Sequence, residues 1–226
     1  MSKLKASDVS KHYSDFSLDD VDLVVGDNET VGILGSNGAG KSTLMEILTG
    51  QESRDKGSVE VLGTDPEEDS SGLQERIGIL PEREDPPSFL TGDEYIEFVS
   101  DIRTDEESEK LIEKVGLDNT SLEKQTRSLS KGQRQKLMVV QAFSHNPELV
   151  FIDEPFINLD PGAQEDVKEI FKEHSEEGGS MVISTHLISL AEEVCDRVIF
   201  LEEGQKVEEA SADQDLKKQF LEAQNR

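Results

Sequence analysis

The sequence holds a single cysteine, Cys195, and no tryptophan among its 226 residues. One cysteine cannot form an intrachain disulfide, and this agrees with a reducing cytosol. No stretch approaches the roughly 18 consecutive apolar residues that a membrane-spanning helix requires, and no apolar run of the signal-peptide type begins the sequence. We therefore expect a chain that is soluble by itself and that works at a membrane only through a partner.

Basic residues are also scarce, because 23 lysines and arginines face 50 acidic residues and leave a net charge of −27. Such a surface repels nucleic-acid phosphate, so we do not expect a general DNA or RNA binder. Two interpretations remain: a basic partner surface, or adaptation to a salt-rich cytoplasm, as in a halophile. The acidic residues are scattered along the chain, which favours the second interpretation and predicts a loss of structure at low salt.

High charge and few aromatic residues are also typical of disorder, but short apolar strands argue against it. Strands and helices alternate on either side of a helical stretch, which predicts a mainly parallel sheet covered on both faces. We predict one domain, 1–226, with an α/β core at 1–82 and 147–226, a small N-terminal antiparallel β part, and an inserted helical lobe at 83–146. The expected strands are 21–25, 30–34, 59–62, 76–80, 149–152, 181–184, 197–201 and 205–207, and the expected helices are 41–48, 93–102, 105–115, 131–145, 163–174 and 187–194.

A glycine-rich segment follows the strand at 30–34 and opens the helix at 41–48. It reads Gly-Ser-Asn-Gly-Ala-Gly-Lys-Ser and matches G-x-x-x-x-G-K-[ST] in the required strand-to-helix context. Its backbone N–H groups and the helix N-terminus favour phosphate, Lys41 can reach the β- and γ-phosphates, and Ser42 can bind Mg²⁺. The sequence therefore predicts a nucleotide site formed by Gly35, Ser36, Asn37, Gly38, Ala39, Gly40, Lys41, Ser42 and Thr43.

Two carboxylates follow the apolar strand at 149–152, where an open parallel sheet binds its ligands. Asp153 at the strand end can hold Mg²⁺, usually through water. Glu154 lies one residue further and can take a proton from an attacking water. An isolated Asp-Glu pair would more often be a solvated turn, but a phosphate-binding loop requires such a metal carboxylate.

Four further segments resemble those of ABC ATPases. Residues 129–133, Leu-Ser-Lys-Gly-Gln, resemble the LSGGQ signature, and residues 155–160 resemble the D-loop that ends in Asp160. Ser-Thr-His at 184–186 resembles the switch histidine, and Tyr13 resembles the aromatic residue that stacks on adenine. Together with the glycine-rich loop these segments cover nearly the whole chain in the family's order. The sequence thus resembles the nucleotide-binding domain of an ABC transporter.

The resemblance implies a P-loop NTPase (RecA-like) core that binds ATP and Mg²⁺ and hydrolyses ATP. It implies a head-to-tail pair of cassettes in which the signature residues Ser130, Lys131, Gly132 and Gln133 lie against the ATP held by the opposite Lys41. Glu154, His186 and Lys41 would be catalytic, and Ser42, Glu82 and Asp153 would serve the metal. Independently, Ser130-x-x-Gln133 is a capping box, so Ser130 can begin a helix whose N-terminus favours an anion.

Three positions depart from the family pattern or stay open. Lys131 replaces the second glycine of the signature, and Glu82 replaces the Q-loop glutamine. A carboxylate at Glu82 can coordinate Mg²⁺ through water but cannot donate a hydrogen bond. Either Tyr13 or Phe16 can stack on adenine, and we favour Tyr13 as the ATP-binding residue, because a tyrosine ring can stack while its hydroxyl stays hydrated.

The resemblance further implies integral membrane permease subunits as partners, no nucleic acid, and a cytoplasmic position on the inner face of the membrane. Lys131-Gly-Gln-Arg134 and Glu82 in a short cassette look most like exporter-type proteins. The alternative is a soluble ABC-type ATPase that works on ribosomes or chromosomes, although the net charge of −27 disfavours it. A P-loop kinase would lack the signature and the switch histidine.

Overall fold

Two β-sheets organise the structure, a computed structural model that describes residues 2–83, 86–102 and 107–223. Within these ranges the larger sheet has the order β5-β6-β7-β3-β8-β9, and its neighbours are parallel except for the antiparallel pair β8 and β9. Its strands are β3 (Thr30–Leu34), β5 (Ile77–Leu80), β6 (Leu149–Asp153), β7 (Ser180–Thr185), β8 (Arg197–Glu202) and β9 (Gln205–Ser211). The smaller, antiparallel sheet has the order β2-β1-β4, from β1 (Ser2–His12), β2 (Ser17–Gly26) and β4 (Lys56–Val61).

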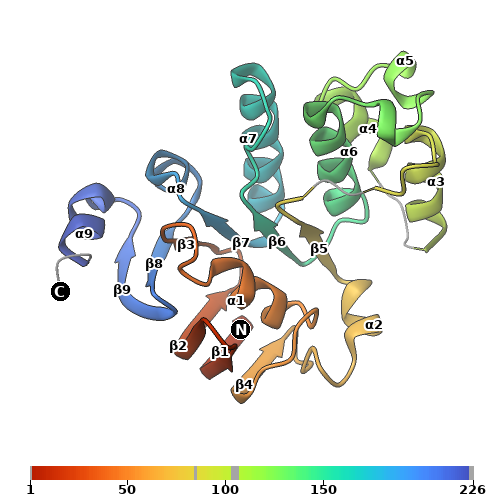
Figure 1. The fold of residues 1–226 in the computed structure, drawn as a ribbon. Coiled ribbons are helices and arrows are strands. Elements are labelled where there is room, and N and C mark those ends of the chain that lie inside the picture. Colours follow the sequence, from red (N-terminus) through yellow and green to blue (C-terminus); the bar gives the residue numbers. More distant parts are fainter. Residues whose placement is uncertain (1, 84–85, 103–106, 224–226) are drawn as a thin grey trace.

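Helices cover both faces of the larger sheet and form a lobe at one end of the molecule (Figure 1). The chain between β5 and β6 supplies this helical lobe: α3 (Gly92–Ile102), α4 (Ser108–Lys114), α5 (Asn119–Leu122), a 3₁₀ turn (Thr126–Ser128) and α6 (Lys131–Phe143). The other helices are α1 (Lys41–Leu48), α2 (Ser70–Gln74), α7 (Pro161–Glu176), α8 (Ile188–Val194) and α9 (Leu216–Ala223).

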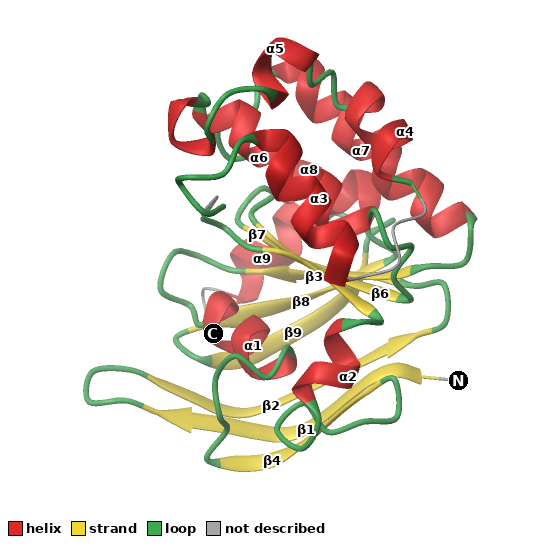
Figure 2. Ribbon diagram, turned by 90° about the vertical axis from the view of Figure 1, so that its right-hand side faces the viewer, coloured by secondary structure: helices red, strands yellow, loops and turns green. Residues whose placement is uncertain are grey.

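The first helix, α1, lies between the two sheets (Figure 2). Its Leu44 and Leu48 are buried in one core with Leu4 of the smaller sheet and with Val31 and Phe151 of the larger one. The opposite face of the larger sheet packs against apolar side chains of α6 and α7. Because both faces of β6 are covered, every residue of its Leu-Val-Phe-Ile-Asp run is buried, as expected of a central parallel strand.

The strand order brings three chemically important strand ends to one edge. β7 lies between β3 and β6, and the three strands are parallel. The carboxyl ends of parallel strands meet at the same edge of a sheet, which is where open α/β sheets bind ligands. The glycine-rich loop after β3, the acidic pair at the end of β6 (Asp153 and the next residue, Glu154) and the Ser-Thr-His segment that extends one residue past β7 therefore share this edge.

The predicted α/β class with a mainly parallel sheet is confirmed, and the strand at 30–34 has its predicted bounds. The expected helix at 105–115 is present as α4 from Ser108, while residues 103–106 lie outside the described part of the chain. The prediction missed α2, α5 and the 3₁₀ turn, which are too short to show a helical period. Strand β9 continues to Ser211, four residues beyond the prediction, because it pairs along β8 as far as Arg197.

Candidate functional site

The glycine-rich loop takes backbone conformations that side chains disfavour. Gly38 and Gly40 have φ angles of 83° and 101°, in the left-handed region where glycine alone is unstrained. A Cβ atom on Gly35 would lie 2.4 Å from the carbonyl oxygen of Leu201, so only glycine fits this close approach. Gly40 is also the residue that precedes α1, so the loop delivers its amides directly to a helix N-terminus.

Lys41 is buried at the start of α1, and its ammonium group is held by the loop itself. The Nζ atom donates to the carbonyl oxygens of Gly35 at 3.0 Å and Ser36 at 3.2 Å. It also lies 3.8 Å from Oε1 of Glu154, whose side chain is buried as well. The cation is thus fixed at the mouth of the loop, where it faces the acidic end of β6.

Neighbouring β7 orients both carboxylates at the end of β6. Asp153 is opposite Ser184 in the β6–β7 register, and the Ser184 hydroxyl donates to Oδ1 of Asp153. Thr185 Oγ1 donates to Oε2 of Glu154 at 3.1 Å, and Nδ1 of His186 lies 2.8 Å from Oε1 of the same carboxylate. The predicted catalytic residues Glu154, His186 and Lys41 therefore form one connected cluster.

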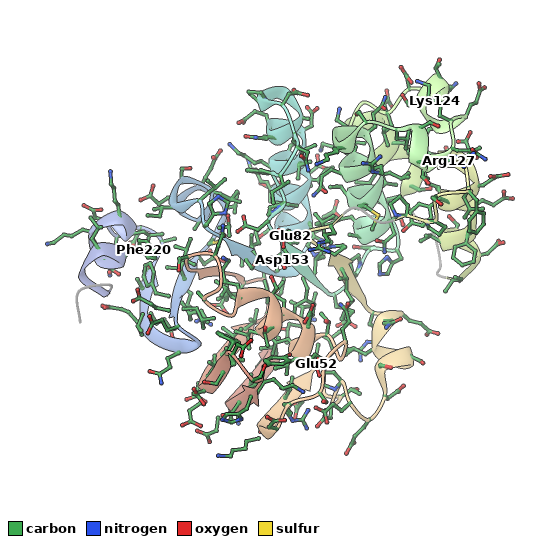
Figure 3. The ribbon with its side chains drawn as sticks, viewed as in Figure 1. Glu52, Glu82, Lys124, Arg127, Asp153 and Phe220 are labelled. Carbon is green, nitrogen blue, oxygen red and sulfur yellow. The ribbon has the colours of Figure 1, made fainter. Side chains whose placement is uncertain are left out.

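A cavity of about 610 Å³ opens at this cluster. Residues of the glycine-rich loop form one wall, and the ends of β5, β6 and β7 contribute acidic side chains and His186. Figure 3 shows Glu82 and Asp153 close together at the centre of the molecule. The lining comprises Asp15, Phe16, Asn37, Gly38, Gly40, Lys41, Ser42, Thr43, Glu82, Asp153, Glu154, Ile157 and His186.

The donor set at this cavity fits Mg²⁺. Ser42, Glu82 and Asp153, the three predicted metal residues, all line it, and they supply one hydroxyl and two carboxylates. Within the described ranges no group of three or more histidine, cysteine or acidic side chains forms a complete metal cage. Mg²⁺ does not require such a cage, because it keeps several waters and binds one or two carboxylates together with substrate phosphates.

Two aromatic rings lie beside the cavity, and they differ in position. Phe16 lines it, and a Cβ on Gly40 would lie only 2.7 Å from Cζ of Phe16, so this ring contacts the glycine-rich loop. Tyr13 is absent from the lining; its ring stacks on Phe16 with centroids 6.5 Å apart, and Lys11 Nζ lies 5.6 Å from its centroid. Phe16 thus lies against the glycine-rich loop, and Tyr13 lies next to Phe16 outside the cavity lining.

The signature residues lie outside this cavity. Ser130 is the N-cap of α6 in a complete capping box: its hydroxyl accepts from the Gln133 amide, and the Gln133 side chain accepts from the Ser130 amide. A Cβ on Gly132 would lie 2.9 Å from the carbonyl oxygen of Asn158, so the start of α6 contacts the segment after Glu154. Lys131 is exposed. None of the four residues lines the cavity formed by the glycine-rich loop of its own chain.

The segment between Glu154 and α7 connects the acidic pair to the helical lobe. Asp160 is the N-cap of α7, and its Oδ1 accepts from the amides of Ala163 and Gly162, which lower the pKa of this carboxyl. Gln135 of α6 is fully buried and donates to the carbonyl oxygen of Pro155 at 3.1 Å. The roles of Gln135 and of the Ser184 and Thr185 hydroxyls are not visible in the sequence, because they depend on contacts between distant segments.

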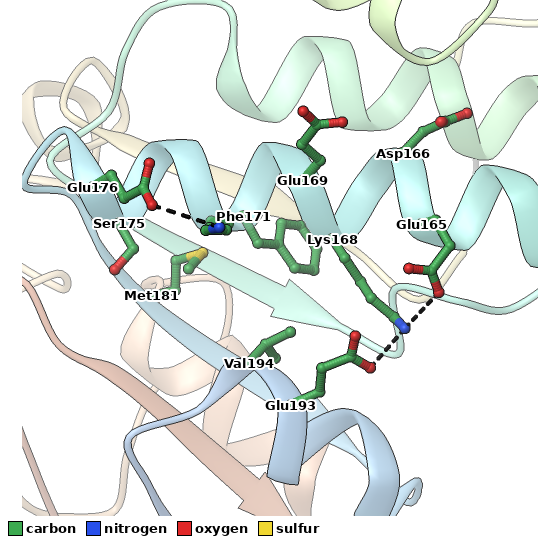
Figure 4. Close-up of a pocket in the computed structure, with 11 residues that line it drawn as sticks. Glu165, Asp166, Lys168, Glu169, Phe171, Ser175, Glu176, Met181, Glu193 and Val194 are labelled. Carbon is green, nitrogen blue, oxygen red and sulfur yellow. Dashed lines mark hydrogen bonds and ion pairs between the residues drawn. The ribbon is translucent and has the colours of Figure 1, made fainter.

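Another cavity, of about 510 Å³, lies between α7 and α8 (Figure 4). Both lysines of its lining are paired, since Lys168 Nζ lies 2.8 Å from Glu165 and 2.6 Å from Glu193, and Lys172 Nζ lies 3.8 Å from Glu176. No predicted site residue lines it. The cavity at the glycine-rich loop is therefore the candidate site.

The fold and this strand-edge site define a P-loop NTPase. A family model described as ABC transporter matches residues 18–157, which is more than half of the chain. The chain therefore belongs to the ABC transporter family and corresponds to its ATP-binding subunits.

Individual relatives agree with this assignment. The chain is 33% identical to the ABC transporter ATP-binding protein YdbJ of Bacillus subtilis over 92% of its own length and 69% of YdbJ. It is 35% identical to sll0415 of Synechocystis over 84% of its length but spans only 55% of that protein. It is 32% identical to the glutamine transport ATP-binding protein GlnQ of Bacillus subtilis over 89% of its length and 88% of GlnQ.

Solved structures share the fold. The solved structure of the ATP-binding subunit of an ABC transporter superimposes on this chain with a TM-score of 0.90 at 27% sequence identity. The superposition covers 98% of this chain and 99% of that subunit. The cassette MJ0796 in a dimer bound to ADP and Pi superimposes with a TM-score of 0.82 at 23% identity, over 93% of this chain and 99% of its own. Among the described residues, no helix is both long and apolar enough to cross a bilayer.

Proposed function

We propose that this chain hydrolyses Mg-ATP and that the reaction drives export of a substrate through separate membrane subunits. One observation carries the proposal: the Glu154 carboxylate lies 3.8 Å from the ammonium of Lys41 and 2.8 Å from Nδ1 of His186, and all three residues line the same cavity. Thr185 donates a hydrogen bond to the same carboxylate. A phosphate-binding loop, a cation and a held carboxylate are the groups that phosphoryl transfer to water requires.

The roles of the residues follow from their chemistry. The loop amides and Lys41 bind the triphosphate and stabilise negative charge on the γ-phosphoryl oxygens as it spreads in the transition state. Glu154 takes a proton from the attacking water, and His186 orders this water and contacts the γ-phosphate. Mg²⁺ held by Ser42, Asp153 and Glu82 would neutralise phosphate charge.

A single chain offers only half of the proposed ATP site. Ser130 caps α6 so that the helix N-terminus remains available to an anion, yet it does not line its own cavity. A second cassette in head-to-tail orientation would bring its own Ser130 and Gly132 to this ATP. The dimeric form of the similar cassette MJ0796 supports this arrangement.

A membrane partner is supported by exposed apolar side chains on the helical lobe. Phe89, Phe98 and Ile102 are 70%, 51% and 60% exposed, in or next to α3. Three of the seven exposed large apolar side chains of the described residues thus lie within residues 89–102, and exposed apolar groups gathered in one region mark interaction sites. We propose that permease subunits contact this side of the lobe and hold the cassette at the inner face of the membrane.

The subclass rests on sequence features alone. Lys131-Gly-Gln-Arg134 and the replacement of glutamine by Glu82 favour an exporter. The scattered acidic residues and the net charge of −27 favour a salt-rich cytoplasm. We propose that residues 1–226 form one cassette, and that its helical lobe, 83–146, transmits closure of the dimer to the permease.

Glu154→Gln tests the proposed reaction. The amide keeps the shape of the side chain but cannot act as a base, so ATP turnover should fall by roughly 100-fold or more. Nucleotide that cannot be hydrolysed should hold two cassettes together, and sedimentation velocity in saturating Mg-ATP should detect a stable dimer. Glu60→Gln, an equal change of charge at an exposed position of β4, is the matched control. A Glu154→Gln protein that remains monomeric with Mg-ATP bound would contradict the proposed head-to-tail dimer.

A further inference from the structure

The chain directly after β6 forms a tight turn, residues 154–158, that begins with the proposed base Glu154. Glu154 and Asn158 have φ angles of 46° and 64°, in the left-handed region that side chains disfavour. Within the turn, the Ile157 amide donates to the carbonyl oxygen of Glu154 at 3.3 Å. Such conformations persist only where the surrounding structure holds them, so the position of Glu154 depends on what contacts this turn.

Strand β7 holds the first residue of the turn from the side of the larger sheet. The Glu154 amide donates to the carbonyl oxygen of Ser184 at 3.0 Å, and Thr185 donates to the Glu154 carboxylate at 3.1 Å. The next residues of the turn pack toward the helical lobe, where Phe156 shares an apolar core with Leu137 of α6. The turn therefore lies between the α/β core on one side and the lobe on the other.

Helix α6 of the lobe contacts the turn at two points. Gln135 Nε2 donates to the carbonyl oxygen of Pro155 at 3.1 Å. One turn earlier in the helix, a Cβ atom on Gly132 would lie 2.9 Å from the carbonyl oxygen of Asn158. Residues three apart share a face of a helix, so one face of α6 contacts both the second and the last residue of the turn.

Gln135 makes this hydrogen bond from within an apolar core. Its side chain is fully buried, and its Oε1 atom has no hydrogen-bond partner among the residues that the structure describes. Nearby residues of α6, Leu137 and Val139, are apolar and buried. A buried amide that lacks one of its hydrogen bonds is unfavourable, and an apolar side chain of similar length would leave no such oxygen. The contact with Pro155 therefore indicates a role for Gln135 beyond packing.

We propose that Gln135 is a positioning residue for ATP hydrolysis: it ties the helical lobe to Pro155 and thereby fixes the neighbouring Glu154 carboxylate in the ATP cavity. A movement of α6 is then passed to the residue next to the base, which makes hydrolysis sensitive to the position of the lobe. This inference rests on the proposed function, in which Glu154 takes the proton of the attacking water. Gln135 does not line the ATP cavity, so a change at this position leaves the groups that bind nucleotide in place.

Gln135→Met tests the proposal. Methionine is unbranched and suits a helix, but it cannot donate a hydrogen bond to Pro155. Gln141→Met makes the same change further along α6, at a half-buried position outside the cavity lining, and is the matched control. Steady-state hydrolysis gives kcat and KM, and equilibrium dialysis gives the ATP dissociation constant. Urea titration followed by circular dichroism gives the stability and the folded fraction, by which kcat is corrected.

We expect Gln135→Met to lower kcat roughly tenfold or more relative to the control, because a small displacement of a reacting group slows the chemical step strongly. The ATP dissociation constant should match that of the control, since the phosphate-binding groups are unchanged. A loss of stability alone, with the kcat of the folded protein equal to that of the control, would overturn the proposal and make Gln135 a packing residue. A loss of ATP affinity as large as the loss of kcat would also overturn it.

A double-mutant cycle tests whether Gln135 acts through Glu154. In single-turnover experiments, Gln135→Met should slow hydrolysis strongly in the unchanged protein but little in the Glu154→Gln background, where the base that it positions is absent. Equal slowing in both backgrounds would contradict the proposal, because Gln135 would then act on another group.

Gln135→Glu provides a second, isosteric variant. A protonated carboxyl can donate to Pro155, and burial favours the protonated form, so the kcat of this variant should recover toward that of the control as the pH falls. If Gln135→Glu stayed as slow as Gln135→Met at every pH, the hydrogen bond would have no part in positioning the base. Failure of the inference in any of these tests leaves hydrolysis and its dependence on Glu154 intact. By contrast, a Glu154→Gln variant that hydrolyses ATP at an undiminished rate would remove the proposed function itself.

Discussion

Glu154 shows how one residue of the site depends on its neighbours. Its backbone has a φ angle of 46°, a left-handed conformation that costs a non-glycine residue about 1–3 kcal/mol. Its amide donates to the carbonyl oxygen of Ser184 at 3.0 Å, and its carboxylate accepts from Thr185. The neighbouring strand β7 thus holds both the backbone and the side chain, and it turns the carboxylate toward Lys41.

The two aromatic rings beside the loop lead to a prediction about nucleotide affinity. Phe16→Leu keeps apolar volume but removes the ring that lines the cavity, so ATP should bind more weakly by about 1–2 kcal/mol, or roughly 5- to 30-fold, in the lower part of the range for base–aromatic stacking. Tyr13→Leu should have a smaller effect, because Tyr13 stacks on Phe16 and does not line the cavity. Equilibrium binding of a fluorescent ATP analogue measures both.

Two further variants serve as controls for the comparison of ATP affinity between Phe16→Leu and Tyr13→Leu. Lys41→Ala removes the ammonium group at the loop and should weaken binding in any case. Tyr13→Phe keeps the ring and should bind like the unchanged protein. A large loss for Tyr13→Leu together with normal binding by Phe16→Leu would make Tyr13 the ring that stacks on adenine.

Single residues of the site were predictable where a short motif carries them. The glycine-rich loop and the acidic pair at 153–154 are contiguous patterns with a required strand or helix beside them, and the structure brings them into one cavity. The hydroxyls of Ser184 and Thr185 were not predictable, because their contacts depend on the register of β6 against β7. Pairing registers arise from the packed sheet as a whole.

At the scale of elements, the start of α6 combines two roles that substitution can separate. Ser130 caps the helix, and caps of this kind contribute about 1 kcal/mol to stability. Aspartate is as good a cap as serine, but it brings negative charge to the helix end that would face the partner's γ-phosphate. Ser130→Asp should therefore unfold at the same denaturant concentration as the unchanged protein, yet it should fail to dimerise in Mg-ATP.

Ser130→Ala provides the complementary variant. It removes the cap without adding charge, so it should lower the free energy of unfolding by about 1 kcal/mol. Urea titration followed by circular dichroism measures stability, and sedimentation in the Glu154→Gln background measures dimerisation. If Ser130→Asp dimerised normally, Ser130 would be a cap and would have no contact with nucleotide.

Elements with a strong periodic pattern were predicted well, and short ones were not. β3, β6 and β7 are buried along their whole length and centre on short apolar runs, since both faces of the larger sheet are covered. α2 and α5 have five and four residues, and side-chain caps from Asp69 and Asp118 begin them. Their position is set by local hydrogen bonds and by packing on the larger elements, neither of which leaves a period in the sequence.

At the scale of the whole molecule, the charge balance matters more than individual ion pairs. Pairs such as Lys172–Glu176 are exposed, and exposed pairs of this kind contribute about 0–1 kcal/mol each. The 50 acidic residues outnumber the basic ones by far more than such pairs can offset. Mutual repulsion among the remaining carboxylates therefore opposes the folded state, and salt must screen it.

The salt dependence of folding follows from this imbalance. The Debye length is about 3 Å at 1 M salt and about 30 Å at 0.01 M. At about 1 M salt the repulsion between carboxylates is therefore screened, whereas at about 0.01 M it acts across the whole molecule. Far-UV circular dichroism should show helix and sheet signal in molar KCl and a loss of it in millimolar KCl. A lower salt concentration also strengthens the attraction within ion pairs, but the net charge of −27 makes repulsion among the carboxylates the larger effect. Sucrose, added to the protein in millimolar KCl at the osmolarity of molar KCl, is the control for a general effect of solute exclusion from the protein surface. If charge screening is the cause, sucrose should not restore the circular dichroism signal. An unchanged spectrum from molar to millimolar KCl would show that packing alone holds the acidic surface together.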